Sequence, residues 1–157
     1  MRRKDREVTD RGEILDIIRR CEAVSVAFSG DTPYVIPMSF GFEEVQGQLV
    51  LYLHGAFEGE KMARIQRDAR VAFSMFTGNR VVESGKACEY TTTFESVCGT
   101  GVMTVVTGEE RRRGLRVLMA HYAPGKELEY DEKMIASTCV MRIDADCVSG
   151  KRKRLPG

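Results

Sequence analysis

The residues best suited to chemistry lie between positions 52 and 61, where the sequence reads YLHGAFEGEK. A strand pattern ends here and a helical pattern begins, with Gly55 and Gly59 flanking the connection and Lys61 in the first helical turn. Free amides and the helix dipole at such a junction attract anions, glycines let a ligand approach the backbone, and lysine adds a positive charge. The junction is therefore a candidate phosphate site. The alternative is an ordinary surface helix, since acidic residues in the same turn would compete with an anion.

His54 is one of two histidines and ends the strand beside this junction. An imidazole held there can donate a proton or orient a ligand, and the alternative is a purely structural histidine. No serine or cysteine forms a recognisable triad with it, and the pattern Gly-x-Ser-x-Gly is absent, so the sequence does not support covalent hydrolysis. We expect the second histidine, His121, to pack on the apolar side of a late helix.

The five cysteines argue against a metal or redox centre. Their number is odd, and no two have the Cys-x-x-Cys spacing that is typical of zinc knuckles and redox pairs. Most lie beside apolar or β-branched residues, so we expect free thiols that behave as small buried hydrophobic groups. Two histidines are also too few for a His-rich metal site.

Length and composition indicate one soluble globular domain. Of 157 residues, 43% are apolar and 30% charged, and there is no tryptophan. The apolar runs are far shorter than the roughly 20 residues that cross a bilayer, and no apolar signal core follows the basic start, so we expect a cytoplasmic protein without membrane contact. The net charge of +1 gives no overall attraction to nucleic acid. We expect the basic run at 151–154 to be a solvated tail.

Hydrophobic periodicity and turn residues predict the secondary structure. Residues 10–13 have the spacing of a capping box, Gln46-Gly47 suits a hairpin turn, and Gly99 and Gly101 indicate a bend or bulge in a strand. Pro37 favours an edge position or a bulge, because proline cannot donate to a ladder. The predicted helices are 11–21, 58–68, 108–122 and 127–137, and the predicted strands are 24–29, 33–42, 49–54, 70–76, 91–107 and 138–148, with a loop at 79–88.

These elements predict a mainly β, α+β fold. The first three strands would form a meander, and the regular strand–helix alternation of a Rossmann sheet is missing. An antiparallel barrel with peripheral helices fits better. We expect a single domain over residues 1–150 and a basic C-terminal tail over 151–157.

Three segments, taken in order, carry a family resemblance. They are VIPMSFGF at 35–42, LYLHGA at 51–56 with Gly59 and Lys61 beyond it, and ESVCGTG at 95–101. Together they resemble the flavin-binding split β-barrel family related to pyridoxamine 5′-phosphate oxidase, and in particular its nitroimidazole-resistance, or Nim-type, branch. The resemblance covers most of residues 1–150.

The resemblance implies a six-stranded antiparallel split barrel that forms a homodimer with FMN in a groove at the dimer interface. The backbone at 37–39 would line the isoalloxazine ring, His54 and Gly55 would pass beside the cofactor, and Lys61 with Gly59 would hold its phosphate. Ser96 would contact the flavin from the next strand or from the partner chain. The implied cofactor-binding set is Pro37, Met38, Ser39, Leu53, His54, Gly55, Ala56, Gly59, Lys61 and Ser96.

The resemblance also implies a function, with two departures from the vitamin oxidases. Glu60 stands where those enzymes carry an arginine beside the lysine, and the C-terminal tryptophan has no counterpart, so pyridoxamine 5′-phosphate oxidase activity is not expected. The implied function is an FMN-dependent oxidoreductase that passes electrons from a reduced nicotinamide or other donor to a small acceptor such as a 5-nitroimidazole, with His54 as proton donor or substrate anchor. The alternatives are a deazaflavin cofactor, or a non-catalytic flavin- or haem-binding protein with His54 as an axial ligand.

Overall fold

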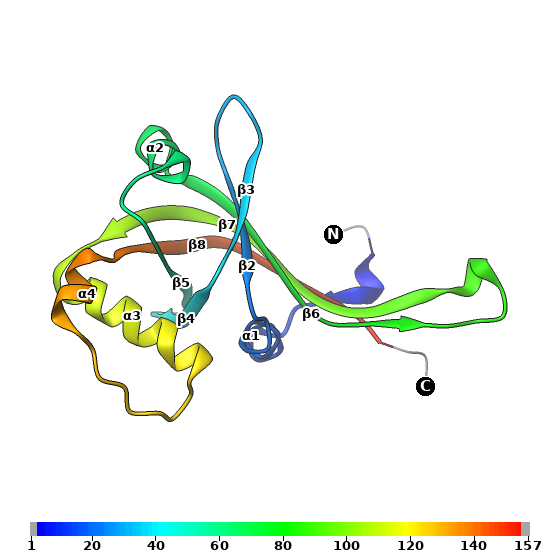
Figure 1. The fold of residues 1–157 in the computed structure, drawn as a ribbon. Coiled ribbons are helices and arrows are strands. Elements are labelled where there is room, and N and C mark those ends of the chain that lie inside the picture. Colours follow the sequence, from blue (N-terminus) through cyan, green and yellow to red (C-terminus); the bar gives the residue numbers. More distant parts are fainter. Residues whose placement is uncertain (1–2, 155–157) are drawn as a thin grey trace.

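The computed structural model describes residues 3–154, which form one antiparallel sheet with helices around it (Figure 1). The strands follow the order β3-β2-β6-β7-β8-β5-β4, and β1 pairs with β8. The strands are β1 (Glu7–Val8), β2 (Val24–Phe28), β3 (Tyr34–Met38), β4 (Phe40–Val45), β5 (Gln48–Gly55), β6 (Arg70–Val82), β7 (Thr91–Val106) and β8 (Cys139–Lys153). The helices are α1 (Arg11–Arg19), α2 (Glu60–Arg67), α3 (Gly108–Tyr122) and α4 (Glu132–Ser137), with 3-10 turns η1 (Lys4–Arg6) and η2 (Ala87–Glu89).

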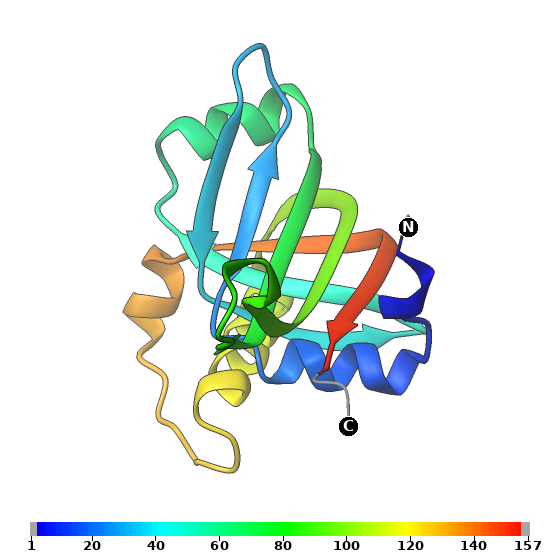
Figure 2. The same ribbon diagram turned by 90° about the vertical axis from the view of Figure 1, so that its right-hand side faces the viewer.

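The expected α+β fold of the split-barrel type is confirmed. Figure 2 shows the strands curving around a common interior with the helices outside. The described residues contain eight strands in place of the expected six, because a short N-terminal strand joins β8 and the segment 33–42 divides in two. In this same part of the chain, no helix is long and apolar enough to span a membrane.

The segment 33–42 does not form the middle strand of a meander, as the sequence predicted. It breaks at Ser39, where β3 ends and β4 begins. Met38 pairs with Val24 of β2, whereas Phe40 pairs with Leu53 of β5. The two strands therefore lie at opposite ends of the strand order. Of the two positions predicted for Pro37, the edge is confirmed, since within residues 3–154 β3 has a neighbouring strand on one side only.

The predicted helix cap, hairpin turn and bulge are confirmed. The Asp10 carboxylate accepts a hydrogen bond from the Glu13 amide at 2.8 Å and so caps α1. Gln46 and Gly47 have φ values of +53° and +81°, as a tight turn of the mirror-image type requires. The register of β7 against β8 shifts next to Gly101, as expected of a bulge.

Strands β6 and β7 form a long hairpin that projects from the barrel (Figure 1). The β2–β6 pairing spans Val71 to Ser74, and beyond it β6 continues to Val82 with β7 as its partner. Residues 79–82, predicted as loop, are therefore strand, because β7 provides their ladder. Helix α4 is shorter than predicted and begins at Glu132 after a cap by Asp131.

Two layers of apolar side chains alternate along β5. Leu51 and Leu53 point into the barrel interior, whereas Val50 and Tyr52 point outward beneath α3. Glycine lets α3 approach this outer face closely, because a Cβ on Gly41 would lie 2.5 Å from backbone atoms of the helix. The Tyr52 hydroxyl donates to Glu110 Oε1 of α3 at 2.5 Å, and burial together with this bond raises the pKa of Tyr52.

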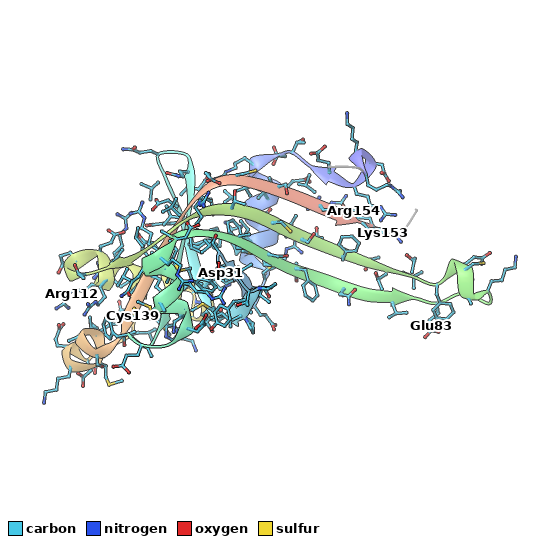
Figure 3. The ribbon with its side chains drawn as sticks, turned by 90° about the horizontal axis from the view of Figure 1, so that it is seen from above. Asp31, Glu83, Arg112, Cys139, Lys153 and Arg154 are labelled. Carbon is cyan, nitrogen blue, oxygen red and sulfur yellow. The ribbon has the colours of Figure 1, made fainter. Side chains whose placement is uncertain are left out.

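The predicted tail begins inside the sheet. Strand β8 continues to Lys153, so the domain does not end at residue 150. Arg152 pairs with Glu13 and Glu95, and Lys151 lies over the ring of Phe94. The side chains are thus used in packing onto β7 and α1. Figure 3 shows Lys153 beside the projecting hairpin and far from Cys139 at the other end of β8.

Candidate functional site

Several predicted site segments meet where β5 ends. Phe40 of β4 pairs with Leu53, so Ser39 stands at the next position of the same ladder. On the other side of β5, Gly55 pairs with Cys139, the first residue of β8. Helix α2 begins a few residues later and returns to this strand end. The structure thus brings together Pro37, Met38, Ser39, Leu53, His54, Gly55, Ala56, Gly59 and Lys61.

Lys61 folds back over the end of β5. A Cβ atom built on Gly55 would lie 2.9 Å from Lys61 Cε and 3.0 Å from its Nζ, so the lysine fills the space that a side chain at position 55 would need. Helix α2 has no side-chain cap and starts from Gly59, whose φ is +107°. Its first amide groups are therefore available to an acceptor from outside the helix. An ammonium group and uncapped amides lie at one junction.

Glu60 does not turn its carboxylate toward the start of the helix. Arg64 Nε donates to Glu60 Oε1 at 2.6 Å, one turn further along α2. The same arginine donates to the carbonyl of Thr32 at 2.6 Å, which fixes it against the β2–β3 loop. Glu60 therefore competes less for the helix N-terminus than its position in the sequence indicates.

His54 lies at the same strand end as Lys61 but on the opposite face. By the alternation of β5, its imidazole shares the outer face with Tyr52, and it pairs across the ladder with Val140. The side chain of Lys61 reaches the inner side, where Gly55 faces Met141. His54 is exposed and available to a bound molecule.

The other residues expected to line the flavin differ in how exposed they are to a ligand. Pro37, Ser39 and Ala56 are exposed and Met38 is half-buried, so each can contact a ligand. Leu53 is fully buried in the barrel interior, which leaves only its backbone for such a contact.

Ser96 is not brought to this junction within one chain. His54 pairs with Val140, which pairs in turn with Val106 of β7. Ser96 lies ten residues before Val106 on the same strand, a separation of roughly 30 Å at the rise of an extended chain. A contact between Ser96 and a ligand beside His54 therefore requires a second copy of the chain.

The structure adds one residue that sequence reasoning missed. Arg111 of α3 donates through Nη1 to the carbonyl of Ala136 at 3.0 Å, and its guanidinium lies 5.5 Å from the ring centroid of Phe57. Its Nε atom is buried and, among residues 3–154, has no hydrogen-bond partner. Burial raises the pKa of the Cys139 thiol, and the charges of Lys61 and Arg111 oppose that rise. The sequence marks Arg111 only as part of a basic run at 111–113.

The other titratable candidates have structural roles. His121 packs against the ring of Phe40 at 4.5 Å between centroids and hydrogen-bonds to the carbonyl of Cys21 at 2.8 Å, as predicted. All five cysteines are free thiols. The expectation that they are buried is wrong for three of them, because Cys88, Cys98 and Cys147 are exposed.

Comparison with known proteins identifies the family. The sequence pattern of the family described as pyridoxamine 5′-phosphate oxidase matches residues 10–152. A comparison with curated proteins finds no match. Among solved structures, a candidate 5-nitroimidazole antibiotic resistance protein from Bacteroides thetaiotaomicron is 29% identical, with a TM-score of 0.80 over 93% of this chain and 86% of that chain.

Two further solved structures share the fold. The FAD and haem binding protein from Mycobacterium smegmatis is 22% identical, with a TM-score of 0.80 over 95% of this chain and 74% of that one. The flavocytochrome from Azotobacter vinelandii is 19% identical, with a TM-score of 0.80 over 99% and 73%. With the family pattern covering nearly all of the described chain, this protein belongs to the pyridoxamine 5′-phosphate oxidase family.

Proposed function

We propose that this protein is a homodimeric oxidoreductase that binds FMN and passes electrons from a reduced nicotinamide to a small acceptor of the nitroaromatic class. The observation that carries the proposal is the junction of β5 and α2, where Lys61 covers Gly55 beside an uncapped helix N-terminus. The fold is also that of a protein that binds FAD and haem and of a flavocytochrome.

The residues at the junction fit the phosphate of a flavin. A phosphate monoester needs cationic and N–H donors and close access to the backbone. Lys61 supplies the cation, the first turn of α2 supplies uncapped amides, and Gly59, where a Cβ would meet nothing within 4 Å, leaves the backbone open. Glu60, held by Arg64, does not block the helix start.

The isoalloxazine ring would lie against the β3–β4 junction. Pro37 and Ser39 are exposed there, and Ser39 directly precedes Phe40, whose partner Leu53 adjoins His54. When bound, the flavin supplies the redox chemistry, which accepts electrons from one substrate and delivers them to the next. The protein holds the ring, and the exposed imidazole of His54 can donate a proton to the reduced acceptor or anchor it.

A second copy of the chain would complete the site. Ser96 can reach a flavin beside His54 only from another protomer, given its position some 30 Å along β7. The described chain also exposes apolar side chains on the projecting hairpin, where Phe76 and Val81 are each 65% exposed. Apolar surface of this kind is typical of an interface between subunits.

The first test is the absorption spectrum of the protein, followed by titration with FMN. We expect flavin bands, a native mass of two chains, and weaker FMN binding in Lys61→Ala. Lys126→Ala, a lysine near the C-terminal end of α3, is the matched control. A Soret band in place of flavin bands, or equal FMN affinity in wild type and Lys61→Ala, would overturn the assignment.

The role of His54 is tested separately. His54→Ala should slow the reduction of a nitroaromatic by the FMN-loaded protein while FMN affinity changes little. Turnover equal to that of the wild type would remove His54 from the mechanism, and loss of FMN binding would make it a cofactor ligand instead. Replacing FMN with a deazaflavin in the same titration distinguishes the two cofactors.

A further inference from the structure

Lys61 is a single cation facing a ligand that needs more charge. A flavin phosphate carries about −1.5 to −2 charges near pH 7, by analogy with other phosphate monoesters. Lys61 neutralises one of these charges at most, and the acidic Glu60 adjoins it. A phosphate site at this junction therefore calls for a second cation from elsewhere in the chain.

We propose that Arg111 is that cation, so that the phosphate of FMN is held between Lys61 of α2 and Arg111 of α3. This inference rests on the proposed function. It assigns a binding role to a residue that lies fifty positions from Lys61 in the sequence, on a helix packed against the opposite face of β5.

Lys61 and Arg111 approach the same end of the sheet from opposite faces, Lys61 from the inner side and Arg111 from the side that α3 covers, so a phosphate between them would lie off the strand end. Lys61 covers Gly55, and Gly55 pairs with Cys139. Arg111 is tied to the carbonyl of Ala136, three residues before Cys139, and both cations act electrostatically on the Cys139 thiol. The two side chains thus approach the Gly55–Cys139 pair from two different elements.

Arg111 differs from the neighbouring arginines of α3 in its lack of an anionic partner within the described part of the chain. Its neighbours on α3 both bind carboxylates, Arg112 to Glu132 and Arg113 to Glu43. Within residues 3–154, Arg111 has no carboxylate partner, and its buried Nε has no acceptor at all. The positive charge of Arg111 therefore lacks an anionic partner among the described residues, and a bound phosphate would supply one.

The surroundings also hold the guanidinium in place. One Nη1 hydrogen bond to Ala136 and the position of the guanidinium over the ring of Phe57 restrain the group before any ligand arrives. Phe57 belongs to the connection between β5 and α2, which is the same connection that precedes Lys61. A pre-oriented planar fork is well suited to phosphate oxygens and loses little conformational freedom on binding.

The test compares FMN with riboflavin, which lacks the phosphate, in wild type, Arg111→Gln and Arg112→Gln. Arg112 is the matched control, because it also ties α3 to α4 but has carboxylate partners of its own. We expect Arg111→Gln to weaken FMN binding by about tenfold or more, with riboflavin affinity unchanged. Arg112→Gln should leave both affinities unchanged. Arg111→Lys, which keeps the charge, should restore part of the preference for FMN over riboflavin.

Inorganic phosphate provides a second readout without flavin. It should raise the melting temperature of the wild type and do so less in Arg111→Gln, which also shows that the variant folds. If Lys61→Ala weakens FMN binding and Arg111→Gln does not, this inference fails and the proposed function stands. Equal losses for FMN and riboflavin, or equal losses in Arg111→Gln and Arg112→Gln, also overturn it. If the wild type binds no flavin, both proposals fail.

Discussion

The close contact between α3 and β4 at Gly41 gives a sharp stability prediction. A methyl group on this residue would lie 2.5 Å from Leu118 N and from Val117 O, which are backbone atoms of the helix. Ordinary van der Waals contact begins near 3.4 Å. In Gly41→Ala the helix must therefore withdraw by about 0.9 Å, since a helix backbone cannot rotate away as a flexible side chain can.

The size of the effect follows from this forced shift. Overpacking costs typically about 1–3 kcal/mol, and the rigid partner places Gly41→Ala near the upper end of that range. Withdrawal of α3 also stretches the hydrogen bond from Phe40 N to the Tyr122 hydroxyl, now 3.1 Å long. For a chain of this length, a loss of about 3 kcal/mol lowers the melting temperature by about 6–12 °C.

The assay is thermal and urea unfolding at one fixed protein concentration, because the proposed dimer would melt at a concentration-dependent temperature. Gly85→Ala is the matched control, since a Cβ there meets nothing within 4 Å. It should change the free energy of unfolding by less than about 0.5 kcal/mol. If Gly41→Ala is as stable as Gly85→Ala, α3 does not pack on β4 as described and the reasoning is refuted.

Three further predictions concern the site, the pH response and the thiols. In Gly55→Ala the new methyl pushes the end of the Lys61 side chain back by about 0.5 Å to reach ordinary contact. A retreat of the ammonium from about 4 to 4.5 Å from the phosphate, at an effective dielectric of 20, weakens FMN binding by about twofold with little change in melting temperature, and unchanged affinity contradicts it. Hydrogen bonds from two arginines lower the pKa of Glu95. The ionised carboxylate therefore stabilises the folded protein above the unfolded pKa of about 4.3, and this stabilisation is lost as pH falls through the lower pKa of the folded state. On acid titration, the free energy of unfolding of Glu95→Gln should fall less steeply than that of the wild type. Burial raises the pKa of Cys21 to about 11, so a thiol reagent should label Cys88 in the native protein and Cys21 only after unfolding, as peptide mass spectrometry would show.

Local signals in the sequence predicted the parts of the fold that depend on neighbouring residues. The Asp10 cap, the turn at Gln46-Gly47 and the bulge beside Gly101 each depend on the conformational preference of a few adjacent residues. Tertiary contacts hardly alter such preferences, and these predictions are confirmed.

Strand partners were harder to predict, because an extended apolar pattern does not specify what it pairs with. The segment 33–42 has one continuous pattern, yet it divides at Ser39 between two partners. Residues 79–82 read as the start of a loop that is mostly polar, and residues 151–153 read as a basic tail. They form strands because β7 lies beside them and supplies backbone hydrogen bonds, which the local sequence does not predict.

The candidate site also has one part that local sequence predicts and one part that depends on tertiary packing. The glycines and lysine of the β5–α2 junction lie within seven residues of one another, so their spacing alone indicated a possible anion site. Arg111 could not be distinguished from Arg112 and Arg113 in the sequence. What separates it is the absence of a carboxylate partner among the described residues, which depends on the packing of α3, α4 and β4.

The central place of β8 has a consequence for synthesis of the chain on the ribosome. This strand lies between β7 and β5 and also pairs with β1, yet it follows every other described strand in the sequence. At about 5–20 residues per second, about 4–17 s pass between completion of β5 and the first residue of β8. Throughout that interval β5 keeps an unpaired edge in the nascent chain, and β7, which ends 33 residues before β8, keeps one for about 2–7 s. Slowing translation should therefore increase aggregation, and a chaperone that covers strand edges should reduce it.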